Sequence, residues 1–417
     1  MSSHDLIYAS VYGTGLGHAY RTTAILRVMS SRGYRAVASS WGEGLRYLRS
    51  RGVPSLEVPE LDVVWGEEGK MRFKDTVRRL AEPFARLAQQ IEVEDRLMAR
   101  LSPRLVISDS RVTPVLAARR RNIRSALVLN QARLMAPRAL GAVRPALEVP
   151  PAQVLAMAWS AASVVLVPDL PPPYTIAGEQ LSAVPQLRGK LRFVGLPIET
   201  CGGRRWSPPR RPFALFSISG PEETKRPAVL KSMAAARLLA RRGWSALIST
   251  ASAGSVESPR EVEDGVYVCG WCECIDDYVS SADVVVSRAG HTSVGKAIYY
   301  GKPSVLLPIP FHGEQESNAL RAQRMGVARV LMRSDLAAPG ELADAVEEAL
   351  DIDGSAIEDA MRVARSMDFA KLSAAAIEEL LQARPLPQVA VEHVVAGHLA
   401  PGPQAHQGAR DPAGNLR

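Results

Sequence analysis

Short apolar runs alternate with longer segments of helical period along most of this chain of 417 residues. In the first half, runs rich in valine, isoleucine and leucine stand at 6–11, 36–40, 104–109, 125–129 and 163–169. Buried runs of this length that alternate with helices are typical of parallel strands in a sheet covered on both faces. The sequence therefore predicts an α/β fold and not a meander of antiparallel strands.

The alternation stops between about 170 and 211, where proline, glycine and arginine accumulate as in a linker. It then starts again, with strands expected at 213–219, 245–250, 266–271, 283–287, 304–309 and 328–332. We predict two doubly wound, Rossmann-like domains that face each other across a cleft. Their expected limits are 1–195 and 212–384, with a linker at 196–211 and a disordered tail at 385–417.

The net charge of +8 is divided unevenly between the halves. Residues 1–198 contain 27 basic and 16 acidic side chains, whereas residues 199–384 contain 22 basic and 25 acidic ones. A basic excess suits nucleic acid, an anionic membrane surface or a phosphorylated substrate. We exclude nucleic acid, because no aromatic interleaving and no known binding module accompany the basic segments.

The first residues, MSSHDLIYAS, lack the features of a signal peptide, and no apolar run reaches the length of a membrane span. We expect a cytoplasmic protein, soluble or peripheral at the inner face of the cell membrane. Cys201, Cys269, Cys272 and Cys274 are too few for a disulfide framework and lack the second ligand pair of a zinc site, so reduced thiols are expected. The Asp351-Ile352-Asp353 sequence follows a helix and is interpreted as surface.

The first strand is followed directly by a glycine-rich turn, Gly13-Thr14-Gly15-Leu16-Gly17-His18. Glycines allow a ligand to approach the backbone closely, and the next helix offers unpaired N–H groups at its start. His18 replaces the last glycine of a dinucleotide fingerprint, and imidazole is a natural general base near neutral pH. The alternative, a purely structural tight turn, stays open at this point.

Three further turns follow strands of the second half. Arg288-Ala289-Gly290-His291-Thr292-Ser293 combines glycine, hydroxyls and N–H groups before a helix, which suits a diphosphate. The segment 310–318 offers Glu314 and Gln315 for sugar hydroxyls, although glutamate also favours the first turn of any helix. The third turn, Ser217-Ile218-Ser219-Gly220-Pro221, is a loop of small residues.

Taken in this order, the four turns resemble those of GT-B fold glycosyltransferases. The closest resemblance is to family 28, the branch of the bacterial peptidoglycan N-acetylglucosaminyltransferase acting on lipid I and its archaeal relatives. GTGLGH with Arg21 resembles the N-terminal loop of that family, and residues 287–319 resemble its donor signature. Residues 268–287 resemble the preceding segment, in which a Gly-Trp pair lies beside the nucleotide base.

The resemblance implies an inverting transfer from a nucleoside diphosphate sugar, UDP-linked and carrying an N-acetylhexosamine or hexose, without metal or other cofactor. His18 is the implied catalytic base, and Asp109 either pairs with it or is merely a strand-end turn residue. The implied acceptor-binding residues are Gly15, Gly17 and Arg21. The implied donor-binding residues are Ser219, Gly220, Trp271, Arg288, Gly290, His291, Thr292, Ser293, Glu314, Gln315 and Asn318.

The chain departs from the family at Lys296, where a ribose-binding glutamate is usual. Lysine has three donors and no acceptor, so it does not replace a bidentate carboxylate, and the nucleotide base and donor sugar stay open. Two alternatives remain: a UDP-N-acetylglucosamine 2-epimerase on the same fold, and a non-catalytic paralogue that binds the nucleotide sugar. For the acceptor we hypothesise a lipid-linked or anionic molecule, with peripheral membrane contact through the basic first half.

Overall fold

The computed structural model describes residues 6–60, 81–182, 184–198, 206, 208, 210–220, 222–250, 256–272 and 274–383. Most of the expected linker, the tail at 385–417 and Cys201 lie outside the described residues. So do residues 71–80, the first part of a long charged helix that the sequence predicts over roughly 71–101. Both sheets described below belong to one compact unit of the chain. Of the helices in the described part, none is both long and apolar enough to cross a membrane.

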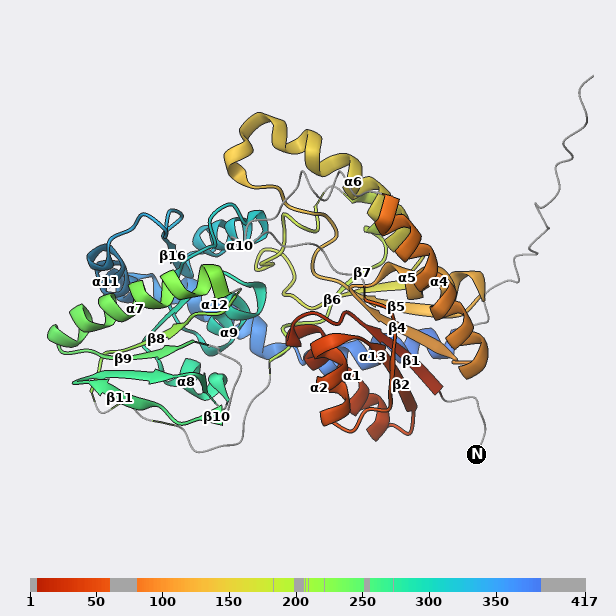
Figure 1. Ribbon diagram of the computed structural model, residues 1–417, viewed down its shortest axis with the longest axis horizontal. Coiled ribbons are helices and arrows are strands. Elements are labelled where there is room, and N and C mark those ends of the chain that lie inside the picture. Colours follow the sequence, from red (N-terminus) through yellow and green to blue (C-terminus); the bar gives the residue numbers. More distant parts are fainter. Residues whose placement is uncertain are drawn as a thin grey trace, which may run out of the picture. The chain divides into compact units, whose positions relative to one another are not determined.

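The first sheet is parallel, with the described strands in the order β3-β2-β1-β4-β5-β6-β7 (Figure 1). Its strands are β1 (Leu6–Val11), β2 (Arg35–Ser40), β3 (Ser55–Glu57), β4 (Leu105–Asp109), β5 (Arg124–Val128), β6 (Val164–Val167) and β7 (Leu191–Phe193). The connecting helices are α1 (Leu16–Ser31), α2 (Gly42–Ser50), α4 (Ala81–Leu101), α5 (Val112–Arg120), η2 (Arg138–Val143), α6 (Arg144–Trp159) and η3 (Pro185–Leu187).

The second sheet has the order β11-β12-β9-β8-β14-β15-β16 and is parallel except for its edge strand β11. Its strands are β8 (Phe213–Ser217), β9 (Ser245–Ser249), β11 (Arg260–Glu263), β12 (Val266–Cys269), β14 (Val284–Ser287), β15 (Ser304–Leu306) and β16 (Ala328–Val330); β10 (Val256–Glu257) and β13 (Trp271–Cys272) pair separately. The helices are α7 (Glu222–Arg241), α8 (Ile275–Ser281), α9 (His291–Tyr300), α10 (Gly313–Arg324), α11 (Pro339–Glu348), η4 (Ala349–Asp351), α12 (Gly354–Ser366) and α13 (Phe369–Gln382). The two doubly wound sheets confirm the predicted fold class.

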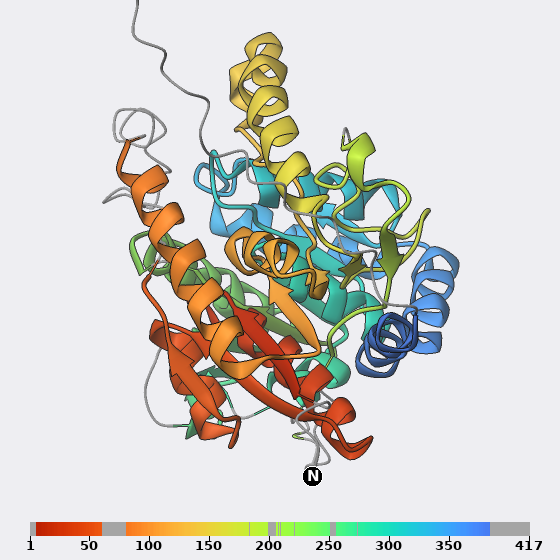
Figure 2. The same ribbon diagram turned by 90° about the vertical axis from the view of Figure 1, so that its right-hand side faces the viewer.

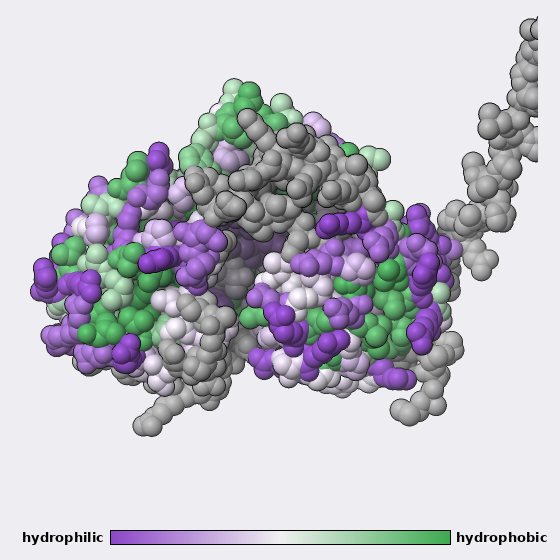
Figure 3. All heavy atoms as spheres, viewed as in Figure 1, coloured by the Kyte–Doolittle hydropathy of each residue, from purple (hydrophilic) through white to green (hydrophobic). Residues whose placement is uncertain are grey.

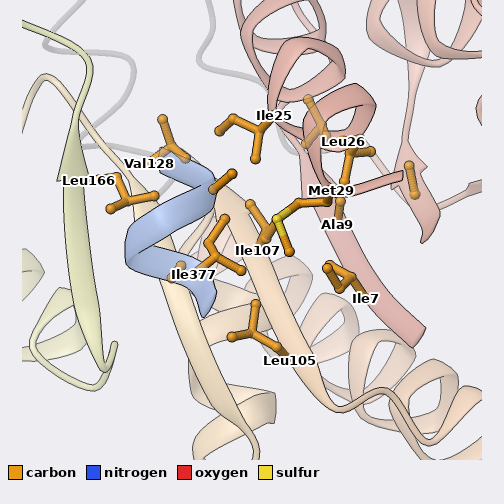
Figure 4. Close-up of a cluster of buried hydrophobic side chains, with 14 of the residues drawn as sticks. Ile7, Ala9, Ile25, Leu26, Met29, Leu105, Ile107, Val128, Leu166 and Ile377 are labelled. Atoms are coloured by element: carbon orange, nitrogen blue, oxygen red, sulfur yellow. The ribbon is translucent and has the colours of Figure 1, made fainter. Parts of the chain in front are cut away.

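The last helix of the folded chain, α13, returns to the first sheet. Its residue Ile377 is buried in a cluster with Leu105 and Ile107 of β4 and Met29 of α1 (Figure 4). The expected limits 212–384 group α13 with the second sheet, whereas the helix packs on the first. Sequence periodicity gives the apolar face of a helix but not the sheet that buries it.

For the region of α6 the sequence predicts only a short helix from Val154 that leads into the strand at 163–169. The structure extends it back to Arg144 and places the 3-10 helix η2 directly before it. Together they project beyond the rest of the first sheet in both views (Figures 1 and 2). Pro150 and Pro151 inside α6 obscured the helical pattern, because proline interior to a helix normally breaks it.

Candidate active site

Three of the four turns singled out in the sequence lie where the strand order of a sheet reverses. In the first sheet β1 lies between β2 and β4, and in the second sheet β8 lies between β9 and β14. Ligands of open α/β sheets bind at the carboxyl ends of strands at such switch points. The structure therefore brings His18 and Asp109 to one switch point and the turns at 217–220 and 287–293 to the other.

The glycine turn before α1 has a backbone that favours glycine. Gly15 caps the helix with a φ of 76°, in the left-handed region that other residues rarely adopt. A Cβ on Gly13 would lie 2.5 Å from the carbonyl oxygen of Trp41. A Cβ on Gly15 or Gly17 would meet nothing within 4 Å among the described residues, so the turn is open there. Their acceptor contact stays a prediction.

His18 and Asp109 are in direct contact. Nδ1 of His18 lies 2.8 Å from Oδ1 of Asp109, which is the last residue of β4. The histidine side chain is 26% exposed and the aspartate side chain is fully buried. Since Nδ1 is held by the carboxylate, Nε2 is the ring nitrogen left for a substrate proton. Asp109 is therefore not merely a strand-end turn residue.

Asp109 is held from several sides. Arg21 donates from Nε to Oδ2 at 2.7 Å and from NH2 to Oδ1 at 2.5 Å, and the Thr22 hydroxyl donates to Oδ2 at 3.0 Å. Burial raises the pKa of Asp109, but the charges of Arg21 and His18 and their hydrogen bonds outweigh burial and hold the pKa well below its usual range. The carboxylate is therefore ionised at neutral pH.

An aromatic pair that the sequence analysis missed flanks the imidazole. The Tyr12 ring lies edge-on to His18 with centroids 5.3 Å apart, and Trp41 lies 5.1 Å beyond Tyr12. The Arg111 guanidinium covers the Trp41 ring at 5.1 Å. Tyr12 could have been found from its place between strand and glycine turn, whereas nothing in the sequence marks Trp41.

A buried polar network supports this wall from behind and was also missed. Glu94 of α4 accepts from the Tyr8 hydroxyl at 2.6 Å and the Ser10 hydroxyl at 3.0 Å, and it pairs with Arg111 at 2.7 Å. Burial and the charge of Glu94 raise the pKa of Tyr8, so the phenol stays a donor. The network fixes α4 against β1.

Arg288, at the second switch point, is a buried cation with no counter-ion among the described residues. Its NH2 donates to the Thr224 carbonyl oxygen at 2.9 Å, but Nε is buried and meets no hydrogen-bond acceptor among the described residues. In the described part of the chain no charged partner offsets the burial of this guanidinium. Burial lowers the pKa of Arg288 to about 10, so it stays charged at neutral pH. This is the chemistry of an anion site.

The helix that follows Arg288 adds N–H donors. α9 begins at His291 after Gly290, and no side chain caps its first turn. Thr292 is exposed and Ser293 is half-buried. An uncapped helix start beside a buried arginine suits the negative charge of a diphosphate.

Two predicted donor residues instead join the halves of the chain. His291 is buried, with Nε2 3.0 Å from Oδ2 of Asp169, just after β6. Asn318 is fully buried, donates to the Ala289 carbonyl oxygen at 3.2 Å and accepts from Gln180 at 2.6 Å. These contacts hold the Arg288 turn against the first half of the chain. The donor contacts expected of both residues stay predictions.

The start of α10 is organised by its own side chains. Gln315 accepts the Ile309 N–H at 2.9 Å, and its N–H donates to Nδ1 of His312 at 3.4 Å. Glu316, which was not predicted, accepts the Arg138 N–H at 2.8 Å. Of the two glutamates in this turn, Glu316 is buried and Glu314 is half-buried. The carboxylate of Glu314 is therefore the one that can reach a sugar hydroxyl.

The other predicted donor residues lie at the surface. Ser219 and Gly220 follow β8 and are exposed, and Gly220 has a φ of 125°. Trp271 on β13 is 38% exposed, which leaves its ring accessible to a planar base. Their contact with a nucleotide stays a prediction.

Three residues with a positive φ that are not glycine lie at the ends of the strands that form these turns. Ser110 follows β4 with a φ of 55°, Ala289 follows Arg288 with 58°, and Phe311 precedes α10 with 63°. Left-handed backbone in such residues costs of the order of 1 kcal/mol each and is concentrated at functional sites. The strain therefore supports the same turns that the sequence singled out.

Lys296 neither touches a diphosphate turn nor points to solvent. Its Nζ pairs with Oδ2 of Asp276, which is buried at the start of α8. The ammonium is therefore neutralised within the fold. The pair therefore supplies no exposed carboxylate that could bind the ribose hydroxyls.

The cysteines differ from expectation. Cys269 and Cys272 form a disulfide, with Cα atoms 5.5 Å apart, so the prediction of reduced thiols is wrong for this pair. The pair flanks the exposed Trp271. Among the described residues, no group of three or more His, Cys, Asp or Glu side chains is placed to hold a metal ion.

Comparison with known sequences identifies the second half of the chain. Residues 259–375 match the glycosyltransferase family 28 C-terminal domain. The resemblance to family 28 is confirmed. The chain is 24% identical over 335 residues to an uncharacterized glycosyltransferase of Methanosarcina acetivorans, covering 78% of this chain and 85% of the relative.

A second relative matches only part of the chain. The UDP-N-acetylglucosamine--N-acetylmuramyl-(pentapeptide) pyrophosphoryl-undecaprenol N-acetylglucosamine transferase of Nitratidesulfovibrio vulgaris is 37% identical over 114 residues, which is 25% of this chain and 30% of the relative. Among solved structures, the calicheamicin glycosyltransferase CalG4 superposes with a TM-score of 0.67 at 18% identity, covering 91% of this chain and 98% of the other. The spinosyn rhamnosyltransferase SpnG, complexed with thymidine diphosphate, gives 0.64 at 16% identity, covering 90% and 99%. The chain is a glycosyltransferase with the GT-B fold.

Proposed function

We propose that this glycosyltransferase moves a hexose or N-acetylhexosamine from a UDP-linked donor to an acceptor hydroxyl, with inversion and without a metal ion. The observation that carries the proposal is the contact between His18 and the ionised Asp109 at the first switch point. A histidine oriented by a buried carboxylate is the usual arrangement of a general base. The relative that is named for a UDP-N-acetylglucosamine donor supports the nucleotide.

The proposed reaction uses His18 on one side of the sugar and Arg288 on the other. Nε2 of His18 takes the proton of the acceptor hydroxyl while the oxygen bonds to the anomeric carbon. The bond from that carbon to the diphosphate oxygen breaks, and its electron pair leaves with the diphosphate. Arg288 and the start of α9 stabilise the charge that develops on the leaving group, and Asp109 holds the tautomer with Nδ1–H.

A donor panel tests the proposal directly. Purified protein is given UDP- and dTDP-sugars with polyprenyl phosphate and diphosphate sugars as acceptors, and release of the nucleoside diphosphate is measured. We expect release with a UDP-sugar that depends on acceptor, and a product of opposite anomeric configuration by NMR. Release with retained configuration would contradict inversion. Tight nucleotide binding without turnover across the panel would favour a non-catalytic paralogue, and a 2-epimerised free sugar would favour the epimerase.

An exposed apolar surface supports a lipid-linked acceptor at a membrane. Of the large hydrophobic side chains that are exposed, six fall within 134–157, and Val154 and Met157 are 68% and 67% exposed. They are Leu134, Leu140, Val143, Val149, Val154 and Met157, which we call the α6 surface. Figure 3 shows apolar side chains at the projecting end of this segment. An exposed apolar surface of this kind suits contact with a bilayer.

The segment that carries the α6 surface begins near the candidate site and ends near basic side chains. At one end, Asn130, just after β5, accepts from NH1 of Arg21 at 3.4 Å. At the other, Lys190 donates to the Ser160 carbonyl oxygen at 2.6 Å, after the last turn of α6. Burial and the charge of Arg119 lower the pKa of Lys190, which places two cations close together there. Such a group favours anionic lipid headgroups.

The α6 surface is tested with vesicles. We expect the protein to co-sediment with phosphatidylglycerol vesicles at low salt and to lose at least tenfold in affinity when Val154→Asp and Met157→Asp are combined. Leu336→Asp, at a residue that is 69% exposed on the second half, is the control and should bind as wild type. No binding of wild type even at low salt, or an equal loss in the control, would contradict a membrane role for this surface.

A further inference from the structure

Arg21 occupies a position that its predicted role does not explain. It stands three residues after His18 on α1, so both side chains lie on the same helix face. The arginine is only 6% exposed, and its donors are directed inward to Asp109, Ser110 and Asn130. Because most of its N–H donors are used within the protein, this guanidinium has few left to bind an acceptor molecule.

The hydrogen bonds fix the carboxylate in one orientation. Arg21 contacts both oxygens of Asp109, and its planar fork fits a carboxylate with two parallel bonds. The Thr22 hydroxyl adds a third donor on Oδ2. Oδ1 therefore faces Nδ1 of His18, and rotation of the carboxylate would break several bonds at once. The partner of the base is thus held before any substrate arrives.

The charges matter as much as the orientation. A lone buried carboxylate beside an imidazole favours the protonated ring, which is useless as a base. Here Arg21 neutralises Asp109, and NH2 of the same guanidinium lies 3.1 Å from Nδ1 of His18. A proton added to the ring would meet this cation at close range. Arg21 therefore favours the neutral imidazole that can accept a proton.

We propose that Arg21 is a positioning residue that sets the pH range in which His18 acts as a base, by orienting and neutralising Asp109. The inference rests on the proposed function, because it assigns His18 the proton transfer. It differs from the predicted role of Arg21 in acceptor binding. Arg21 acts through its neighbours and touches no reacting atom.

Few groups from the neighbouring elements face the pair formed by His18 and Asp109. Tyr12 comes from the loop after β1, Arg21 and Thr22 come from α1, Ser110 follows β4, and Asn130 follows β5. Among these described contacts, Arg21 is the cation and Asp109 is the anion. A change at Arg21 therefore alters the charge balance at His18 more than a change at any of the others.

The test compares Arg21→Gln with Arg21→Lys. In Arg21→Gln the carboxylate loses its counter-ion, so the acidic limb of the kcat/KM profile should move about one pH unit or more toward alkaline pH. Arg21→Lys keeps the charge but loses the fork, so the limb should stay in place while kcat falls about tenfold. The KM for the acceptor should change by less than about threefold in both variants. A strong rise in acceptor KM with an unmoved limb would overturn the proposal in favour of acceptor binding.

A second readout does not need activity. The titration of the His18 imidazole is followed by NMR in the ligand-free protein, with His18→Ala to assign its signal. Arg21→Gln should raise the titration midpoint by about one unit, and adding Asp109→Asn should bring it back down. An unmoved midpoint in a folded Arg21→Gln protein overturns the proposal. If the midpoint moves but wild type transfers no sugar, the charge balance stands and the proposed function fails.

Discussion

Replacing His18 with alanine is expected to abolish sugar transfer while nucleotide binding is retained. His18 is the imidazole at the first switch point, and its Nδ1 is held 2.8 Å from a carboxylate that stays ionised. Loss of a general base typically lowers the rate about 100- to 10,000-fold. The donor turns around Arg288 lie on another sheet and do not involve His18, so the affinity for the nucleoside diphosphate should change little.

The measurement is release of nucleoside diphosphate under saturating donor, together with calorimetric titration of the same nucleotide. Asp109→Asn should cost a large part of the same rate, because the imidazole loses its preferred tautomer. The double variant should be little worse than His18→Ala alone, because the two residues act as a unit. Asp95→Asn is the matched control: Asp95 pairs with Arg121 at the surface. Full activity of His18→Ala would remove His18 from the mechanism.

The elements of this fold could be read from the sequence because both sheets consist mainly of buried parallel strands. Runs such as 104–109 and 283–287 have three consecutive apolar residues at their centre and lie close to the strands β4 and β14. His18, Asp109 and Arg288 lie at or just beyond the carboxyl ends of β1, β4 and β14, where ligands of parallel sheets bind. Periodicity and glycine placement marked the turns that carry His18 and Arg288, whereas Asp109 was found only through the family resemblance.

The partners of these residues could not be read in the same way. Asp109 is 91 residues from His18, and their contact depends on the pairing of β1 with β4. Arg21 looked free to bind an acceptor because its burial against Asp109 depends on that same pairing. His291 looked like a diphosphate ligand because its contact with Asp169 joins two distant halves of the chain. Long-range register decides such contacts, and local pattern does not contain it.

The basic excess of the first half has a different meaning once the contacts are known. Arg133, Arg138 and Arg144 lie around η2 next to the α6 surface, but they pair with Glu148 and Glu179. Burial alone would raise the pKa of Glu179, yet the Ser317 hydrogen bond and the charges of Arg138 and Arg144 lower it, so Glu179 stays ionised. Two carboxylates against three guanidiniums leave this cluster with one net positive charge. The charge next to the α6 surface is therefore mostly internal. Arg119 and Lys190 are better placed than this cluster to attract an anionic surface.

Replacing Arg288 with methionine is expected to change stability and function in opposite directions. The guanidinium is buried without a carboxylate among the described residues, so its charge is a cost in the ligand-free protein. Methionine fills a similar volume without that charge. We expect the ligand-free variant to be as stable as wild type or more stable, by about 1 kcal/mol, in denaturant titrations.

The same variant should no longer be stabilised against unfolding by the nucleotide. A nucleoside diphosphate at 100 times its Kd stabilises wild type by about 2.7 kcal/mol, and this shift should nearly vanish in Arg288→Met. Turnover should fall about 100- to 1,000-fold, because the cation that meets the leaving diphosphate is gone. Arg329→Met is the control, since Arg329 is exposed and pairs with Glu348. A variant that is clearly destabilised without ligand yet still responds to the nucleotide would show that Arg288 is structural, because a cation that binds the diphosphate cannot be removed without weakening that response.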